Sequence, residues 1–305
     1  MANAKEIKRK IKSIQNTSKI TKAMELISTV KMKKAQNLAL SKKDFVLEML
    51  KIFTRLESFL GDYPFFQDAE EGGKTLGIII TSNKGLCGGY NVNVMKKVNE
   101  YVQENEKEDI EYVAIGKKAA AFIARTGNTL VADYSPDFTD NIEPVFIKNI
   151  MRPLYDDFLG GKYNKVVIFY NYYVNSIKQI PIAREFLPIE GDQIKEYLTK
   201  VAGEHFDVQK ELATVAEGHD YDVEPSMEDI AFQLIPMVLD LMFYDILLEA
   251  KASEHSARMV AMKAAKDNSK KIADDLTLAY NKARQAMITK EVSEIVGWVE
   301  SLKEV

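Results

Sequence analysis

Residues 257–286 read ARMVAMKAAKDNSKKIADDLTLAYNKARQA and contain neither glycine nor proline. Small or apolar side chains recur in this stretch every three or four positions, which is the spacing of one face of an α-helix. These positions are Ala257, Ala261, Ala264, Asn268, Ile272, Leu276, Ala279, Ala283 and Ala286. Because small side chains let two helices approach closely, the stretch predicts a long helix that lies against a second one.

The other end of the chain supplies a candidate for that second helix. Residues 1–60 also lack glycine and proline, and their apolar residues step by three and four positions. A helix of about 55 residues would be roughly 80 Å long, which exceeds a single compact core, so it needs a long partner. We therefore predict an antiparallel coiled coil of N- and C-terminal helices. The steps are carried by Ile7, Ile11 and Ile14, and later by Phe45, Met49, Ile52, Leu56 and Phe59.

The C-terminal helix has a recognisable start. Ser226 follows Pro225, and Asp229 stands three positions further on, which is the spacing of a capping box. Pro236 lies just inside the expected helix and is expected to kink or restart it. Beyond Pro236 there is no proline, and Gly297 is the only glycine.

The middle of the chain has a different character. Fourteen of the fifteen glycines lie between Gly61 and Gly218, and glycine is a strong punctuator of local structure. Strand-like runs alternate there with helical runs, which favours a parallel sheet with helices on both faces, that is, a small Rossmann-like α/β domain. The expected strands are 75–81, 112–115, 130–131, 165–170 and an edge strand at 176–186, and the expected helices are 92–106, 117–125 and 144–159.

The expected fold class is therefore α/β, with three parts along the chain. Residues 1–60 form an N-terminal shaft helix, residues 61–225 an α/β base domain, and residues 226–305 a C-terminal shaft helix. An acidic stretch at 191–224 is expected to be a loop with some helix. Residues 1–43 hold twelve Lys and Arg but two acids, whereas residues 191–230 hold eleven acids and three lysines.

The composition excludes several classes of protein. The 305 residues carry a net charge of −4 and a single cysteine, so no internal disulfide and no cysteine-rich metal site is possible. The longest apolar runs fall far short of the roughly 20 residues of a membrane span, and the N-terminus lacks the apolar core of a secretory signal.

One glycine-rich turn stands where a nucleotide-binding loop would stand. Gly85-Leu86-Cys87-Gly88-Gly89 follows the first expected strand and precedes a helix, but it lacks the G-x-G-x-x-G spacing. A tight turn with an inert, buried Cys87 is the favoured interpretation. The three histidines His205, His219 and His255 form no metal-ligand pair and are expected to be solvated or to face a partner. We expect no catalytic, cofactor or metal site.

Two polar features suggest macromolecular contacts. The basic N-terminal helix suits nucleic acid or an acidic protein surface, although Arg9 is its only arginine among twelve basic residues. Arg284 and Gln285 stand side by side in an otherwise small-residue helix. They are either a solvent-facing pair or a directional hydrogen-bonding contact to a partner loop.

Eight motifs are spread over both ends and the middle of the chain. In chain order they are Lys19-Ile20-Thr21-Lys22-Ala23-Met24-Glu25, Lys31-Met32-Lys33-Lys34-Ala35, the turn from Thr81 to Asn91, Glu224-Pro225-Ser226, Leu247-Leu248-Glu249-Ala250, Ala252-Ser253-Glu254-His255-Ser256-Ala257-Arg258-Met259, Tyr280-Asn281-Lys282-Ala283-Arg284-Gln285-Ala286 and Ile288-Thr289-Lys290-Glu291. In these motifs the chain resembles the F-type ATP synthase gamma subunit family. Asn83 stands where the family usually has Asp, and Trp298 and Val299 stand where it usually has a small Gly-Ala pair.

The resemblance implies a rotor shaft that couples ion flow to ATP synthesis and hydrolysis without doing chemistry itself. The implied partners are a ring of three alpha and three beta subunits, the epsilon subunit and the membrane c-ring, at the cytoplasmic side of the cell membrane. Two alternatives stay open: a Rossmann-type nucleotide-binding enzyme and a basic coiled-coil nucleic-acid binder. The implied rotor–stator contacts are Met24, Arg258, Arg284, Gln285, Thr289 and Glu291, and Gly85, Gly88 and Gly89 form the turn.

Overall fold

A computed structural model describes residues 2–42, 45–46, 48–49, 52–53, 64–66, 73–202 and 226–303. The chain divides into two compact units: one joins Met1–Ser28 to Arg258–Val305, and the other is Thr29–Ala257. We call them the two-helix unit and the α/β unit. Two long helices contribute to both units, α1 (Ala2–Leu40) and α8 (Met227–Lys303). Among the described residues, no helix combines the length and apolar character that a membrane span needs.

The α/β unit is built on one five-stranded sheet with the order β3-β2-β1-β4-β5. The first four strands are parallel, and β5 pairs antiparallel with β4 at the edge. The predicted strands are all confirmed, including the short one after residue 129 and the edge strand. Their bounds are β1 Lys74–Ile80, β2 Ile110–Ile115, β3 Leu130–Asp133, β4 Tyr163–Tyr173 and β5 Gln179–Leu187.

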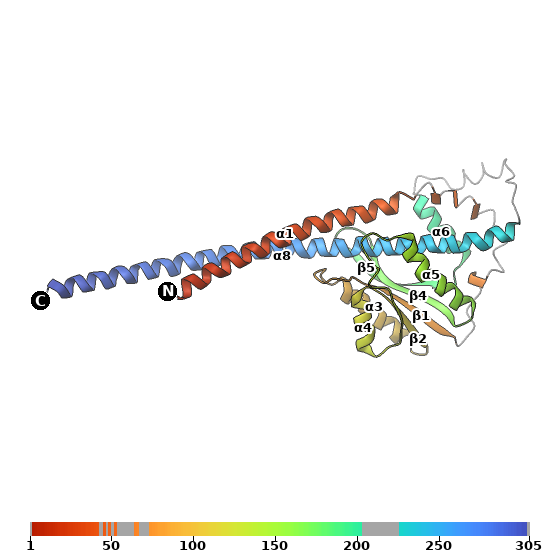
Figure 1. Ribbon diagram of the computed structural model, residues 1–305, viewed down its shortest axis with the longest axis horizontal. Coiled ribbons are helices and arrows are strands. Elements are labelled where there is room, and N and C mark those ends of the chain that lie inside the picture. The colour runs from red at the N-terminus through yellow and green to blue at the C-terminus, as the bar shows by residue number, and fades with distance from the viewer. Residues whose placement is uncertain are drawn as a thin grey trace. The chain divides into compact units, whose positions relative to one another are not determined.

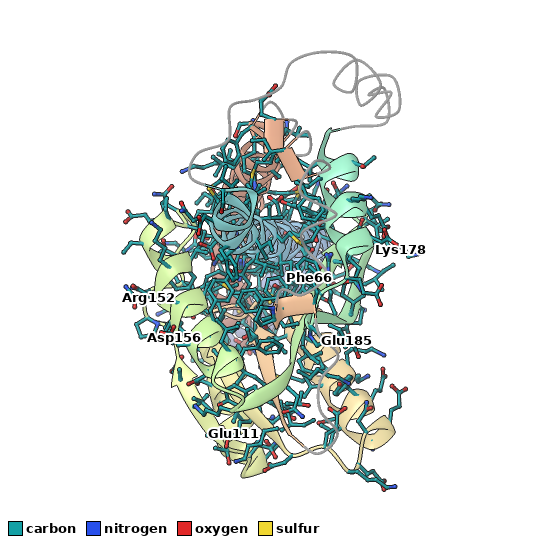
Figure 2. The ribbon with its side chains drawn as sticks, turned by 90° about the vertical axis from the view of Figure 1, so that its right-hand side faces the viewer. Phe66, Glu111, Arg152, Asp156, Lys178 and Glu185 are labelled. Atoms are coloured by element: carbon teal, nitrogen blue, oxygen red, sulfur yellow. The ribbon has the colours of Figure 1, made fainter. Side chains whose placement is uncertain are left out.

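Helices cover both faces of this sheet, as predicted. Side chains alternate between the faces along each strand, so Ile78 and Ile80 enter one core and Ile79 enters the other. In Figure 2, Phe66 lies toward the first core, whereas Arg152 and Asp156 lie on the outer side of α5. The second core lies under α3 (Tyr90–Glu104) and α4 (Lys117–Thr126), and the first lies under α5 (Pro144–Leu159), α6 (Gly191–Ala202), a short 3-10 helix (Pro64–Phe66) and the first part of α8.

The predicted unbroken N-terminal helix of about 55 residues is wrong, because α1 ends at Leu40. The Ser41 hydroxyl donates to the Leu38 carbonyl at 3.0 Å, and serine commonly ends helices by such local bonds. Beyond this turn, the buried apolar positions are Val46, Met49 and Phe53. They join the core of the α/β unit, so the chain changes its packing partner at this point. Of the five apolar positions expected in this segment, three are described: Met49 is buried, and Phe45 and Ile52 are exposed. Leu56 and Phe59 lie outside the described residues.

In the two-helix unit, α1 and α8 lie side by side and run in opposite directions (Figure 1), which confirms the antiparallel pair. An ion pair of 2.7 Å between Lys266 Nζ and Glu25 Oε2 joins them. The least exposed positions of α1 recur every three or four residues, as in a coiled-coil seam. They include the predicted isoleucines and are Ala4, Ile7, Ile11, Ile14, Ser18, Thr21, Glu25 and Ser28.

The seam of α8 is shifted by one position from much of the predicted stripe. Ile272 is 40% exposed, whereas Ala273 next to it is buried. A helix rich in alanine offers two such registers, and the one that buries Met262 and Ala273 is used. Ala264, Asn268, Ala279 and Ala286 are exposed as well. The observed seam is Met262, Ala265, Ser269, Ala273, Leu276, Tyr280, Ala283 and Met287.

The predicted start of α8 is confirmed. The Asp229 amide donates to the Ser226 hydroxyl at 3.1 Å, and that hydroxyl donates to the Asp229 carboxylate at 2.7 Å. The helix then continues through Pro236, whose carbonyl accepts a hydrogen bond of 3.1 Å from the Tyr155 hydroxyl. Of the expected acidic loop, residues 191–202 form α6, and 203–224 lie outside the described residues.

Candidate partner-contact surface

Four of the predicted contact residues lie on the C-terminal part of α8. Arg284, Gln285, Thr289 and Glu291 are all exposed. Successive helix residues are 100° apart, so Gln285 and Thr289 lie on the side of the helix opposite the seam that carries Ala283 and Met287. Arg284 lies beside the seam, and Glu291, four positions after Met287, continues its line beyond the last half-buried position. The Thr289 hydroxyl donates to the Gln285 carbonyl at 3.0 Å. The placement suits a partner-facing set, and it equally suits the solvated pair that is the alternative for Arg284 and Gln285.

Beyond the seam, α8 presents apolar side chains to its surroundings. From Ile288 to Val299 every residue is exposed, although apolar residues recur at helical spacing. Their exposed fractions are 50% for Ile288, 53% for Val292, 64% for Ile295 and 48% for Val299. Trp298 is 74% exposed. A contiguous exposed apolar face of this kind is typical of a surface that binds another protein.

The other two predicted contact residues are less accessible. Met24 is half-buried beside the seam of α1. Arg258 is 8% exposed, so little of its side chain is available to a partner. The structure therefore does not bring all six predicted residues onto one surface.

The glycine turn is a structural turn, as expected. Gly88 has φ +58°, a conformation that favours glycine, and Gly89 is the N-cap residue before α3, with an ordinary φ of −79°. A Cβ at Gly85 would meet no atom within 4 Å. Leu86 also has a positive φ of 64° and is 63% exposed. Cys87 is 2% exposed, which confirms a buried thiol.

Side chains around this turn connect it to the rest of the sheet edge. Asn83 Nδ2 donates to the carbonyls of Ser135 and Phe138, both at 3.0 Å. Asn83 Oδ1 accepts from the Lys117 amide at 2.9 Å. Asn83 thus joins the segments that follow three neighbouring strands, β1, β2 and β3.

A shallow cavity of about 370 Å³ lies next to the turn, and it is lined by α3 and α4 residues such as Val92, Phe122 and Arg125.

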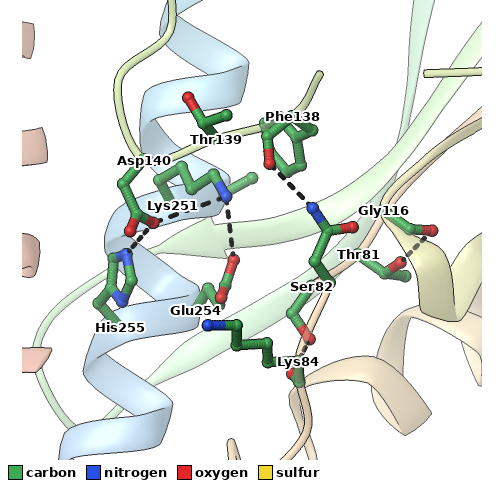
Figure 3. Close-up of polar contacts among 12 residues, drawn as sticks. Thr81, Ser82, Lys84, Gly116, Phe138, Thr139, Asp140, Lys251, Glu254 and His255 are labelled. Carbon is green, nitrogen blue, oxygen red and sulfur yellow. Dashed lines mark hydrogen bonds and ion pairs between the residues drawn. The ribbon is translucent and has the colours of Figure 1, made fainter. Parts of the chain in front are cut away.

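A buried cluster of charges on α8 is the feature that the sequence prediction missed (Figure 3). His255 Nε2 lies 2.8 Å from Asp140 Oδ1, and Lys31 Nζ lies 2.5 Å from Asp140 Oδ2. Lys251 Nζ lies 3.8 Å from the same carboxylate and 3.5 Å from Glu254. Lys251, Glu254 and His255 are each no more than 5% exposed. The expectation of a solvated or partner-facing His255 is therefore wrong; His205 and His219 lie outside the described residues.

The electrostatics of the cluster centre on one carboxylate. The hydrogen bond from His255, followed by that from Lys31, holds the pKa of Asp140 well below its usual range. Burial acts in the opposite direction but is outweighed. Asp140 is thus ionised at neutral pH.

The sequence alone does not predict that these residues contact one another. Asp140 stands 109 positions from Lys31 and 115 from His255, and no spacing rule connects them. The one available signal is the density of polar residues at 251–256 in a helix that is otherwise buried, since buried polar groups need partners.

Known proteins resemble this chain along nearly all of its length. A family model described as ATP synthase matches residues 3–302. The ATP synthase gamma chain of Methylibium petroleiphilum is 38% identical over 307 residues, which cover 97% of this chain and 98% of the relative. The gamma chain of Nitrosomonas eutropha is 36% identical with the same coverage, and that of a Roseiflexus species is 35% identical over the whole of both chains.

Solved structures share the fold. A chain of the Euglena gracilis mitochondrial ATP synthase, in a structure of OSCP, F1 and the c-ring, superposes with a TM-score of 0.65 at 19% identity, covering 99% of this chain and 95% of that one. A central-stalk chain from the Tetrahymena thermophila mitochondrial ATP synthase gives 0.54 at 24% identity, covering 81% and 99%.

Proposed function

The chain belongs to the ATP synthase gamma chain family, and we propose that it works as a non-catalytic shaft whose exposed α8 face contacts the beta subunits. The gamma subunit is the central-stalk rotor of the enzyme, and its partners are the alpha and beta subunits, epsilon and the c-ring. The proposal concerns how the residues of this chain carry out that role.

One observation supports the proposal above others: the exposed apolar face from Ile288 to Val299, which continues beyond the end of the seam. Packing against α1 does not account for these apolar side chains, because they lie beyond the seam that the two helices share. The face suits a surrounding protein sleeve, because burial of apolar area drives association. Arg284, Gln285 and Glu291 stand just before or on this stretch and supply polar contacts.

A shaft of this kind acts by making different contacts in different orientations. A ligand or partner shifts a conformational equilibrium only by its differential affinity for the two states. The two helices present unlike surfaces around their circumference, with the seam on one side and Arg284 and Gln285 on another. As the shaft turns, each beta subunit meets a different surface, and its nucleotide affinity changes accordingly.

The α/β unit takes the remaining contacts in this proposal. It joins epsilon and the c-ring, and the complex holds the chain at the membrane as a peripheral component on the cytoplasmic side. The two alternatives, a Rossmann-type enzyme and a nucleic-acid binder, lack support: the family model and the relatives named above are those of ATP synthase and its gamma chain, and the turn after β1 lacks the dinucleotide spacing.

The test is a double substitution, Arg284→Ala with Gln285→Ala, in the assembled complex. Alanine is the best helix former, so the isolated chain should fold normally. A buried hydrogen bond to a charged group is worth about 1.5–3 kcal/mol, so ATP hydrolysis should fall roughly ten-fold or more. Lys282→Ala is the matched control, since Lys282 is exposed on the same turn but on another side of the helix.

The control complex should hydrolyse ATP at the wild-type rate. Wild-type rates in a fully assembled double variant would show that Arg284 and Gln285 are simply solvated and have no coupling role.

A further inference from the structure

Asp140 connects three segments of the α/β unit through a single carboxylate. It lies in the loop between β3 and α5, and it binds Lys31 of α1 at 2.5 Å and His255 of α8 at 2.8 Å. Asp140 Oδ1 contacts His255, and Asp140 Oδ2 contacts Lys31. Figure 3 shows the α8 side of this arrangement. The two long helices are therefore joined to the same short loop.

The loop itself is held rigidly at the end of the sheet. Asn83, which follows β1, donates to the carbonyls of Ser135 and Phe138 on either side of the loop's bend. The Ser135 amide donates to the Asp133 carboxylate at 2.8 Å at the end of β3. Asp140 is thus attached to two strand ends, so a force on its carboxylate is transmitted to the sheet.

The α8 side of the contact is also fixed. Lys251 lies over the Phe138 ring with its Nζ 3.7 Å from the ring centroid, and it pairs with Glu254. Charged groups as buried as these are costly unless they are paired and hydrogen-bonded in one geometry. The cluster therefore specifies how α8 is rotated against the loop, which apolar contacts alone, being non-directional, specify less sharply.

We propose that Asp140 is a positioning residue for rotary coupling: it fixes α1 and α8 to the end of the sheet so that torque passes between the two helices and the α/β unit without slip. Both helices continue from this unit into the two-helix unit. When the complex works against a load, the sheet must resist rotation of the helices. The directional bonds from Asp140 to Lys31 and His255 supply that resistance.

The test uses Asp140→Asn in the assembled, membrane-reconstituted ATP synthase. The side-chain shape is kept, and the carboxylate is 40% exposed, so the variant should fold and assemble. Ions pumped per ATP hydrolysed are measured as the opposing membrane potential is raised. We expect unloaded ATP hydrolysis within two-fold of wild type, and a loss of at least half of the coupling ratio at high load.

Asp137→Asn is the matched control, because Asp137 lies exposed in the same loop and its carboxylate makes no ion pair among the described residues. Its coupling ratio should follow the wild type at every load. Lys31→Met should lose coupling in the same direction, and combining it with Asp140→Asn should add little, because both remove the same contact.

A merely structural role makes a different prediction. It predicts that Asp140→Asn lowers the melting temperature while coupling at high load stays at the wild-type value, and that result would overturn the proposal. If the Asp140→Asn variant fails to assemble, the Lys31→Met variant alone tests the proposal. Wild-type coupling of this variant at high load would contradict the proposed role of Asp140, and a coupling ratio that falls as the load rises would support it.

Discussion

The α/β unit and the two-helix unit bury their residues in very different ways. The α/β unit has two apolar cores, one on each face of its sheet, with many side chains completely enclosed. In the two-helix unit, the described apolar residues that are buried are few and small or flexible, namely Ala4, Met262 and Ala273, and each keeps 4–8% exposure. Several of its large apolar residues stand outside the seam: Ile20 is 60% exposed and Ile295 is 64% exposed.

This difference separates two tasks within one chain. Apolar area removed from water is the dominant favourable term in folding, so stability is concentrated in the α/β unit. The two-helix unit leaves several large apolar residues available, which suits contact with other subunits. Substitutions of enclosed apolar residues in the α/β unit should accordingly affect folding, and substitutions of exposed residues in the two-helix unit should affect assembly or coupling.

The largest effect on stability should come from the second core of the α/β unit. Phe169 is fully buried and meets the Tyr101 ring edge-on, with 5.3 Å between centroids. Phe169→Ala should cost about 3–5 kcal/mol of unfolding free energy, which urea unfolding followed by circular dichroism would measure. Ile20→Ala, on the exposed face of α1, should stay within about 0.5 kcal/mol of wild type. Equal losses of unfolding free energy from Phe169→Ala and Ile20→Ala would contradict the claim that stability is concentrated in the α/β unit.

A somewhat smaller effect should come from backbone crowding between β1 and β2. Gly116 has φ +113°, and a Cβ there would lie 2.2 Å from the Thr81 carbonyl oxygen. Gly116→Ala should therefore destabilise the chain by about 2–4 kcal/mol. Gly85→Ala is the control, because its Cβ would meet nothing within 4 Å, and its melting temperature should not change. A wild-type melting temperature for Gly116→Ala would show that the strand ends can separate easily.

Much of this contrast could be predicted from the sequence. Breaker-free ends with steps of three and four positions predict the helix pair, and alternating strand and helix runs predict the sheet. The break after Leu40 could not be predicted, since the residues around Ser41 are ordinary helix formers and tertiary burial of Val46, Met49 and Phe53 decides it. The register of α8 was ambiguous for a related reason: a helix rich in alanine has two nearly equivalent faces.

The candidate contact residues also divide into those that the sequence could predict and those that it could not. Arg284 and Gln285 could be selected because they interrupt a small-residue helix, and exposure is a local property that helix geometry predicts. Asp140 could not be selected, because its partners come from helices more than 100 positions away in each direction. Contacts between distant segments depend on the packing of the whole α/β unit rather than on any local pattern.

A modest, pH-dependent effect should distinguish Asp140 from the surface carboxylates. Its pKa is lowered by His255 and Lys31, so its contribution to stability is fully present above the unfolded-state pKa of about 3.9 and is lost progressively as the pH falls from there through the lower folded-state pKa. Asp140→Asn should cost about 1–2 kcal/mol at pH 7, a low value because water screens a 40% exposed carboxylate. Urea unfolding at several pH values should show a difference from wild type that is constant near neutral pH and that shrinks progressively as the pH falls below about 4. A difference that stays constant from pH 7 down to the lowest pH at which the chain is folded would mean that the carboxylate charge is not its source.

The central claim is that the exposed face of α8 becomes covered by the alpha and beta subunits, and cysteine labelling tests it most directly. The only native cysteine, Cys87, is buried, so Ile295→Cys offers one accessible thiol. Maleimide labelling of this chain is compared before and after assembly with alpha and beta, with Asn128→Cys on the exposed loop before β3 as the control. We expect the Ile295→Cys labelling rate to fall at least ten-fold on assembly while the control rate is unchanged. Equal labelling of Ile295→Cys in the free chain and in the complex would contradict the account.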